Sequence, residues 1–187
     1  MPTRVERHDD KGPAVTLRPA NNADWPLILS WLKMPEVERW WGSQSAAQAE
    51  IRLVFETSSA LARIIEVGGE PIGYTHAIDA TFWGEHLPEG LPPGAWDVEV
   101  FVAAPEHRGR GIGAAALDLL AKEVFSTTLA VALSVFVSVR NEHAVRAYES
   151  AGFAWVQVWD DPIFGASWLM LRQRPDALPR PLQARLI

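Results

Sequence analysis

The chain has 187 residues, 17 Lys and Arg against 23 Asp and Glu, a formal net charge of −6, nine tryptophans and no cysteine. This length fits one compact domain, and the lack of Cys excludes a disulfide scaffold, a thiolate zinc site and a cysteine nucleophile. The acidic balance argues against nucleic acid or an anionic membrane as the main partner, since both need clustered Lys or Arg, and it favours a small cationic substrate.

The two ends of the chain differ in composition from its middle. Residues 1–12 are polar and predict a flexible arm without the apolar stretch of a signal peptide. Residues 174–187 contain three prolines together with arginines and predict an extended tail. Charges interrupt every apolar run before 18 residues, so no segment is expected to span a bilayer. We therefore expect a cytoplasmic protein with one domain at residues 13–173.

Strands and helices alternate along that domain. In chain order the predicted elements are a strand at 15–18, a helix from 21 to 32, a helix at 45–56, strands at 61–67 and 70–78, a loop at 80–95, a strand at 96–103, a helix at 111–124, a strand at 132–139, a helix at 141–151, and strands at 153–159 and 167–171. Gly68-Gly69 is typical of a hairpin turn, and Gly152 stands where a left-handed helix cap belongs. The pattern predicts an α/β protein with a mixed sheet.

A glycine-rich segment at residues 108–114 lies between a predicted strand and the helix that follows it. Glycines at alternate positions let the backbone turn tightly with its N–H groups pointing outward. Together with the positive end of the helix, these groups form a cradle for a phosphate or pyrophosphate. Arg108 and Arg110 can add charge-assisted contacts. The alternative is a plain surface turn, but a turn needs one such glycine and this segment has three.

Two classes of cofactor fit this segment. Gly109, Gly111 and Ala114 also satisfy the dinucleotide fingerprint G-x-G-x-x-G/A, and Arg140 after the next strand suits a 2′-phosphate. The fingerprint, however, requires a short turn directly after the strand, and residues 105–108 intervene here. An NADP-binding oxidoreductase therefore stays an alternative at this point.

A second motif follows the buried strand at 132–139. The loop at 108–113 resembles the acyl-CoA loop of the GNAT acetyltransferase superfamily, Arg/Gln-x-x-Gly-x-Gly/Ala. The family's later signature is matched by Asn141, Ala144, Tyr148, Glu149, Gly152 and Phe153. Residues 17–19, the Trp-Trp-Gly at 40–42 and the Gly-Glu-Pro-Ile-Gly-Tyr at 69–74 resemble the aminoglycoside 6′-N-acetyltransferase branch. The resemblance implies a central, mostly antiparallel sheet with a splayed strand pair and helices on both faces.

The resemblance also implies acetyl-CoA as acyl donor cosubstrate. In this family the loop N–H groups hold the pyrophosphate and the pantetheine arm lies along the splayed edge of the preceding strand. The cofactor-binding residues implied here are Phe101, Val102, Ala103, Arg108, Gly109, Arg110, Gly111, Ile112, Gly113, Ala114 and Asn141. Asn141 has a second interpretation as a helix cap.

Acetyl transfer from a thioester to an amine needs an acid for the departing thiolate and an acceptor for the amine proton. Tyr148 stands at the position of the family's general acid, and its alternative role is packing. Glu99 aligns with the acidic residue that the aminoglycoside enzymes place near the attacking amine. It can act as base or only attract the cation. The period of two puts Asp97, Glu99 and Phe101 on one face of their strand.

Aromatic and acidic residues cluster in the segments expected to face the acceptor. The substrate-side residues predicted are Trp40, Trp41, Trp83, Trp96, Asp97 and Glu85. Aromatic faces with carboxylates suit a polyamine or an amino sugar, although core packing is the commoner fate of tryptophan. The loop at 80–95 does not match the aminoglycoside enzymes, so a peptide or protein amine stays an alternative acceptor. A non-catalytic acyl-CoA-binding module is a further alternative. No metal site is expected. A homodimer is possible only in the sense that the resemblance implies it, since members of the family are often dimers.

Overall fold

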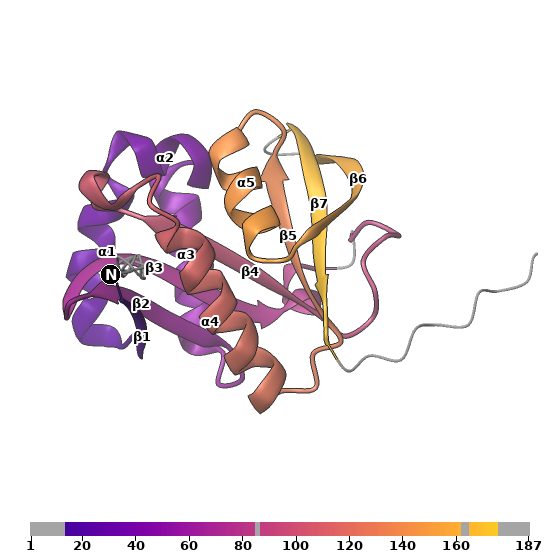
Figure 1. Ribbon diagram of the computed structural model, residues 1–187, viewed down its shortest axis with the longest axis horizontal. Helices are drawn as coiled ribbons and strands as arrows, with labels where there is room; N and C mark the ends of the chain where they lie inside the picture. Colours follow the sequence, from indigo (N-terminus) through magenta and orange to yellow (C-terminus); the bar gives the residue numbers. More distant parts are fainter. Residues whose placement is uncertain (1–13, 85–86, 162–164, 176–187) are drawn as a thin grey trace, which may run out of the picture.

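A seven-stranded sheet runs through the middle of the protein (Figure 1). The computed structural model describes residues 14–84, 87–161 and 165–175. The sheet has the order β1-β2-β3-β4-β5-β7-β6, and only β4 and β5 pair in parallel. The strands are β1 (Val15–Pro19), β2 (Leu61–Val67), β3 (Glu70–Asp79), β4 (Ala95–Val102), β5 (Ala132–Ser138), β6 (Ala154–Asp161) and β7 (Gly165–Gln173).

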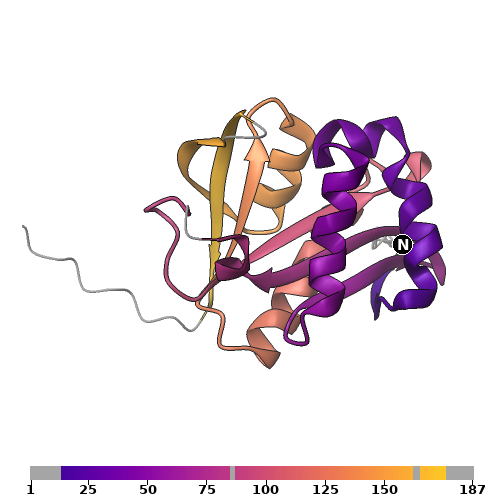
Figure 2. The same ribbon diagram turned by 180° about the vertical axis from the view of Figure 1, so that it is seen from behind.

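Helices cover both faces of this sheet, as the views from front and back show (Figures 1 and 2). One layer consists of α1 (Trp25–Leu32), α2 (Pro35–Trp41) and α3 (Gln44–Glu56), and the other of α4 (Ile112–Thr127) and α5 (Glu142–Ser150). Each layer closes its own apolar core: Ile28 and Ile51 pack against Phe101 on one side, and Leu117 and Leu120 pack against Val98 on the other. The predicted architecture is confirmed.

The predicted elements also recur in the structure with small shifts at their ends, with one exception. Helix α2 was not predicted, although the residues that define it are readable. Pro35 occupies its first turn, Gly42 with φ 75° ends it, and Val37 and Trp41 are buried four residues apart. These are the ordinary start, stop and core signals of a helix, compressed here into seven residues.

The parallel pair β4/β5 is short. The two strands are in register only from Ala95 opposite Ala132 to Asp97 opposite Ser134, and then they diverge. The rest of β4, residues 98–102, has β3 on one side and, within the part of the chain that the structure describes, no partner strand on the other. The splayed strand pair implied by the sequence resemblance is thus confirmed.

The register against β3 decides which backbone groups of β4 face this gap. Ala103 N–H donates to the Ile72 carbonyl at 2.8 Å, while Val102 lies opposite Gly73. Because bonded and non-bonded pairs alternate between antiparallel strands, the N–H and C=O groups of Val100 and Val102 point away from β3 and toward the gap. The side chains alternate as well, and Phe101 lies in the core beneath α1–α3 while Val98 lies in the core beneath α4.

Arg174 fastens the chain after β7. Its guanidinium donates to the carbonyl oxygens of Phe125, Thr128 and Ala130 at 2.6–2.7 Å. The first residue of the predicted tail is therefore held against the end of α4, while the rest of that tail from residue 176, and the predicted arm at 1–12, lie outside the described residues. Among the helices described, none has the length and apolarity needed to cross a membrane.

Gly73 is required by a close approach of two strands. A Cβ atom at this position would lie 2.3 Å from the Phe101 carbonyl oxygen in β4. We expect Gly73→Ala to push β3 from β4 and to lower the free energy of unfolding by about 1–3 kcal/mol, measured by denaturant unfolding. Gly113→Ala is the matched control, since a Cβ there meets nothing within 4 Å. Equal stability of the two variants would contradict the expectation.

Candidate active site

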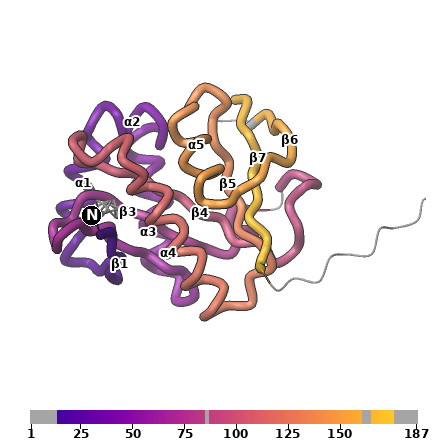
Figure 3. Tube along the Cα trace, viewed as in Figure 1, coloured from indigo at the N-terminus to yellow at the C-terminus, as the bar shows by residue number. Residues whose placement is uncertain are grey.

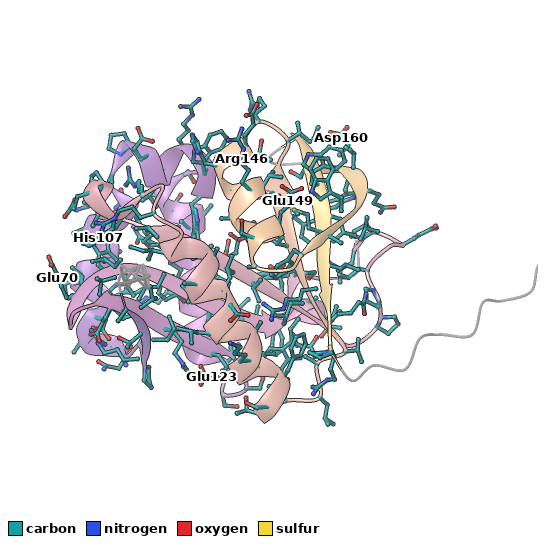
Figure 4. The ribbon with its side chains drawn as sticks, in the orientation of Figure 1. Glu70, His107, Glu123, Arg146, Glu149 and Asp160 are labelled. Carbon is teal, nitrogen blue, oxygen red and sulfur yellow. The ribbon has the colours of Figure 1, made fainter. Side chains whose placement is uncertain are left out.

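A cleft of about 1140 Å³ opens where β4 and β5 diverge. Its walls come from the loop before α4, from α5, from β4 and β5, and from α2 and α3. The chain trace in Figure 3 shows these segments brought together from distant parts of the sequence. His107 and Arg146, both labelled in Figure 4, line it from the loop and from α5, respectively.

The glycine loop has the tight left-handed turns that the predicted cradle requires. Gly109 and Gly111 adopt left-handed backbone conformations, with φ values of 68° and 76°. Within the described chain, no backbone acceptor is found for the N–H groups from Gly109 to Ala114, and the first that is bonded is Ala115, to the Gly111 carbonyl. A run of free N–H groups at the start of the 16-residue helix α4 is suited to an anion.

The Arg108 guanidinium is hydrogen-bonded to other groups of the protein. Its guanidinium donates to the carbonyl oxygens of Val102 at 2.9 Å and Ala103 at 2.7 Å, which ties the loop to the end of β4. Arg108 still lines the cleft, whereas Arg110 is exposed and does not line it. The loop N–H groups, rather than the arginine pair, are thus the feature that can bind an anion here.

The structure refines the predicted contacts along β4. Of the three positions named from the sequence, Val102 turns its backbone toward the gap, while Phe101 and Ala103 turn theirs toward β3. Val100, which was not named, faces the gap as Val102 does. Asn141 lines the cleft, and its side chain accepts a hydrogen bond from Ala144 N–H at 3.2 Å as the cap of α5.

Tyr148 projects from α5 into the same cleft. It is 3% exposed and packs edge-on against Phe153 at 5.3 Å. Burial raises the pKa of its hydroxyl well above the ordinary value, and the charge of Glu99 raises it further. A backbone hydrogen bond with Val100 acts in the opposite direction. The hydroxyl therefore keeps its proton at neutral pH and lies beside the free edge of β4.

The side chains of Glu99 and Asp97 lie on the same face of β4 but have different surroundings. Glu99 lines the cleft, and burial raises its pKa well above the ordinary value, with the charges of Glu50 and Asp97 adding to the effect. Asp97 is 5% exposed, does not line the cleft, and accepts hydrogen bonds from Trp83 Nε1 at 2.9 Å and from the Ser134 hydroxyl. Its pKa is raised to about 8, mainly by burial.

Glu50 of α3 is a cleft residue that the sequence analysis missed. Its side chain is 29% exposed, its Oε1 lies 3.7 Å from His76 Nε2, and burial raises its pKa to about 7. A signal was present: Glu50 follows buried Ala47 by three residues and precedes buried Ile51, so it borders the apolar face of its helix. Periodicity alone did not show what that face packs against.

The predicted acceptor residues fall into two groups. Trp40 and Trp41 line the cleft. Trp96 is 7% exposed and belongs to the core beneath α4, and the indole of Trp83 is bonded to Asp97, so neither lines it. Glu85 lies outside the described residues. The structure brings the two tryptophans of α2 together with Glu99 and Tyr148, and it gives Trp83, Trp96 and Asp97 buried or bonded positions elsewhere.

The sequence that forms this fold and cleft matches a known protein family. Residues 20–160 match the model of the acetyltransferase (GNAT) domain. The chain therefore belongs to the GNAT acetyltransferase family, and the resemblance seen in its motifs is confirmed. The match does not support the alternative of an NADP-binding oxidoreductase.

Two curated relatives carry the same name. Aminoglycoside N(6′)-acetyltransferase type 1 of Klebsiella pneumoniae is 27% identical over 148 residues, which are 75% of this chain and 74% of the relative, and the protein of that name from Serratia marcescens gives the same values.

Solved structures of acetyltransferases share the fold. The aminoglycoside acetyltransferase AAC(6′)-Ib in complex with paromomycin and acetyl-CoA has a TM-score of 0.75 and 26% identity, over 86% of this chain and 94% of its own. Spermidine N-acetyltransferase of Vibrio cholerae, in complex with CoA and spermine, has a TM-score of 0.66 at 16% identity, over 86% and 95% of the two chains, and shares the fold.

The buried carboxyl groups predict how stability depends on pH. With pKa values of about 7 for Glu50 and about 8 for Asp97, the folded protein holds protons that the unfolded chain has already lost. Stability is therefore lost as pH rises through these values. We expect Tm to fall by a few degrees between pH 7 and 8.5, and Glu50→Gln to flatten the curve. His76, with a pKa of about 3, is neutral throughout this range. Calorimetry that shows Tm rising across it would refute the assignment.

Proposed function

We propose that the protein is an acetyl-CoA-dependent N-acetyltransferase that transfers an acetyl group to a primary amine of a small cationic acceptor, an amino sugar or a polyamine. The observation that carries this proposal is a single cleft that combines free loop N–H groups, an open edge of β4, a protonated Tyr148 and carboxylates. The named relatives, aminoglycoside N(6′)-acetyltransferases, support the choice of amine.

Each part of the cleft has a task in this reaction. Acetyl-CoA supplies an acetyl group activated as a thioester. The N–H groups of residues 109–114 bind its pyrophosphate, which has the charge that this helix start attracts. The Val100 C=O and the Val102 N–H, turned toward the gap and not used by Tyr148 or Arg108, offer hydrogen bonds to an extended arm laid alongside β4. Arg108 fixes the loop relative to this edge, so that both binding elements keep one spacing.

Proton transfer follows from the positions of Tyr148 and Glu99. The neutral amine attacks the thioester carbonyl, a C–N bond forms, and the C–S bond breaks. Tyr148 gives its proton to the departing sulfur, and Glu99 takes the proton that the amine must lose, directly or through a water. The raised pKa of both groups suits these roles, because the phenol stays protonated and the carboxylate is a stronger base than an exposed one.

A screen for release of CoA tests the proposed activity. The acceptors are aminoglycosides, polyamines and peptide amines, each with acetyl-CoA as donor. We expect turnover with the first two groups, and acetyl-CoA should raise Tm while NADPH should leave it unchanged. Turnover confined to peptide amines would replace the acceptor class, and a Tm that rises only with NADPH would overturn the proposal.

The two tyrosines of the chain provide a matched pair of variants. Tyr148→Phe keeps the packing against Phe153 but removes the acid, so we expect kcat to fall by about 10²-fold or more with acetyl-CoA still raising Tm. Tyr74 is equally buried but lies outside the cleft lining. Tyr74→Phe should leave kcat unchanged. If the two variants have the same kcat, Tyr148 is not the general acid.

A further inference from the structure

We propose that Glu50 and Glu99 together form a site for acceptors that carry a second ammonium group close to the reacting amine. Glu99 receives the reacting amine and Glu50 the second one. This inference rests on the proposed function and deepens it, because it names a specificity-determining residue on α3 that lies outside the sequence motifs.

Three side chains from three elements meet at this end of the cleft. His76 of β3 lies directly opposite Glu99 of β4, so the two side chains point to the same face of the sheet with Cβ atoms about 5 Å apart. From α3, Glu50 brings its Oε1 to 3.7 Å from His76 Nε2. Both glutamates line the cleft, whereas His76 lies beneath them with no exposed surface.

His76 does not balance the charge of the glutamates. Both of its ring nitrogens are buried without a hydrogen-bond partner among the described residues. Burial lowers its pKa to about 3, so the ring is neutral at physiological pH. A neutral ring beside Glu50 cannot replace the hydration that this carboxylate loses in the cleft, and an ammonium group can.

No other cation of the described chain neutralises Glu50 or Glu99. The ion pairs found there join no Lys or Arg to Glu50 or Glu99. Two of the arginines that line the cleft have other contacts, since Arg39 stacks over the Trp40 ring at 4.8 Å and Arg108 is bonded to carbonyl groups. Two carboxyl groups without cations in one cleft hinder each other's ionisation, and a ligand with two positive charges favours the ionised form of both.

The position of Tyr148 decides which carboxylate receives which amine. Glu99 precedes Val100, whose backbone contacts the Tyr148 hydroxyl, and its charge acts on Tyr148 more strongly than that of Glu50. Glu99 is thus the carboxylate near the transfer, while Glu50 approaches from the opposite helix layer. Trp41 also lines the cleft and sets its ring edge-on to His76 at 6.0 Å, which provides an aromatic wall beside the second ammonium group.

Matched acceptors with one and two amines test the site. The pairs are butylamine with 1,4-diaminobutane, and 6-amino-6-deoxyglucose with 2,6-diamino-2,6-dideoxyglucose. In the wild type the diamine should have the lower KM. Glu50→Gln should raise KM for each diamine about tenfold, with KM for the monoamines and kcat nearly unchanged, and Glu50→Asp should restore part of the difference. Glu56→Gln, on the exposed side of the same helix, is the control and should change neither.

Binding measured without turnover separates this inference from the proposed activity. Calorimetric titration of the CoA-saturated protein with each diamine should show weaker binding to Glu50→Gln than to the wild type. If binding depends on Glu50 but no acceptor releases CoA, the proposed transfer fails and the diamine site stands. If CoA is released and Glu50→Gln changes KM equally for monoamines and diamines, or for neither, the transfer stands and the diamine site is refuted. Failure of the wild type to bind any diamine refutes it as well.

Discussion

The divergence of β4 from β5 is the constraint on which the rest of the site depends. Two strands that stayed paired beyond Asp97 and Ser134 would satisfy the backbone of Val100 and Val102 and leave no cleft. Because they part, the N–H and C=O groups of Val100 and Val102 need partners that are not strands. Arg108 supplies one partner, at the Val102 carbonyl, and the same bond orients the glycine loop. Donor binding is therefore a consequence of an incomplete sheet, in which groups that would be costly to bury unpaired are left for a ligand.

The acceptor side depends on unpaired charge in the same way. Glu50, Glu99 and Asp97 approach one another from α3 and β4, and each holds its proton at a higher pH than an exposed carboxyl group does. Among the described residues, Asp97 alone of the three accepts hydrogen bonds from side chains, those of Trp83 and Ser134. The buried pair Asp97–Trp83 thus braces the short helix η2 (Ala80–Trp83) against β4, while the two glutamates are the groups that we propose for a cationic ligand. One face of a single strand thus has a structural residue at position 97 and the proposed base at position 99.

A feature could be predicted from the sequence when the residues that determine it lie close together in the chain. The glycine loop, Tyr148 and the faces of β4 are set by residues close in the chain, and their motif and period were readable. Trp96 was placed on the acceptor side because its segment borders that side, but it lies on the opposite face of β4, in the core beneath α4. Asp97 was placed there because a period of two assigns a face but not a depth, and the indole of Trp83 covers this carboxyl group. Glu50 was missed because its relation to Glu99 exists only once α3 packs across the sheet. The same limit applied to β4, where the strand was predicted but the direction of its backbone groups depends on the register with β3.

The buried polar groups under the cleft lower the stability of the free protein, and His76 is the one among them that contacts Glu50. The Tyr74 hydroxyl and both nitrogens of His76 are buried without partners among the described residues, and each such group costs about 1–3 kcal/mol. An apolar side chain of similar size would avoid this cost in a layer that already contains Ile51, Ile64 and Phe101. His76 nevertheless lies where its ring meets Glu50, at the floor of the cleft. A hydrated cation that enters the cleft loses water, and a polar floor can replace part of that water. The stability that the free protein loses by burying these polar groups can therefore be regained as affinity when an acceptor binds.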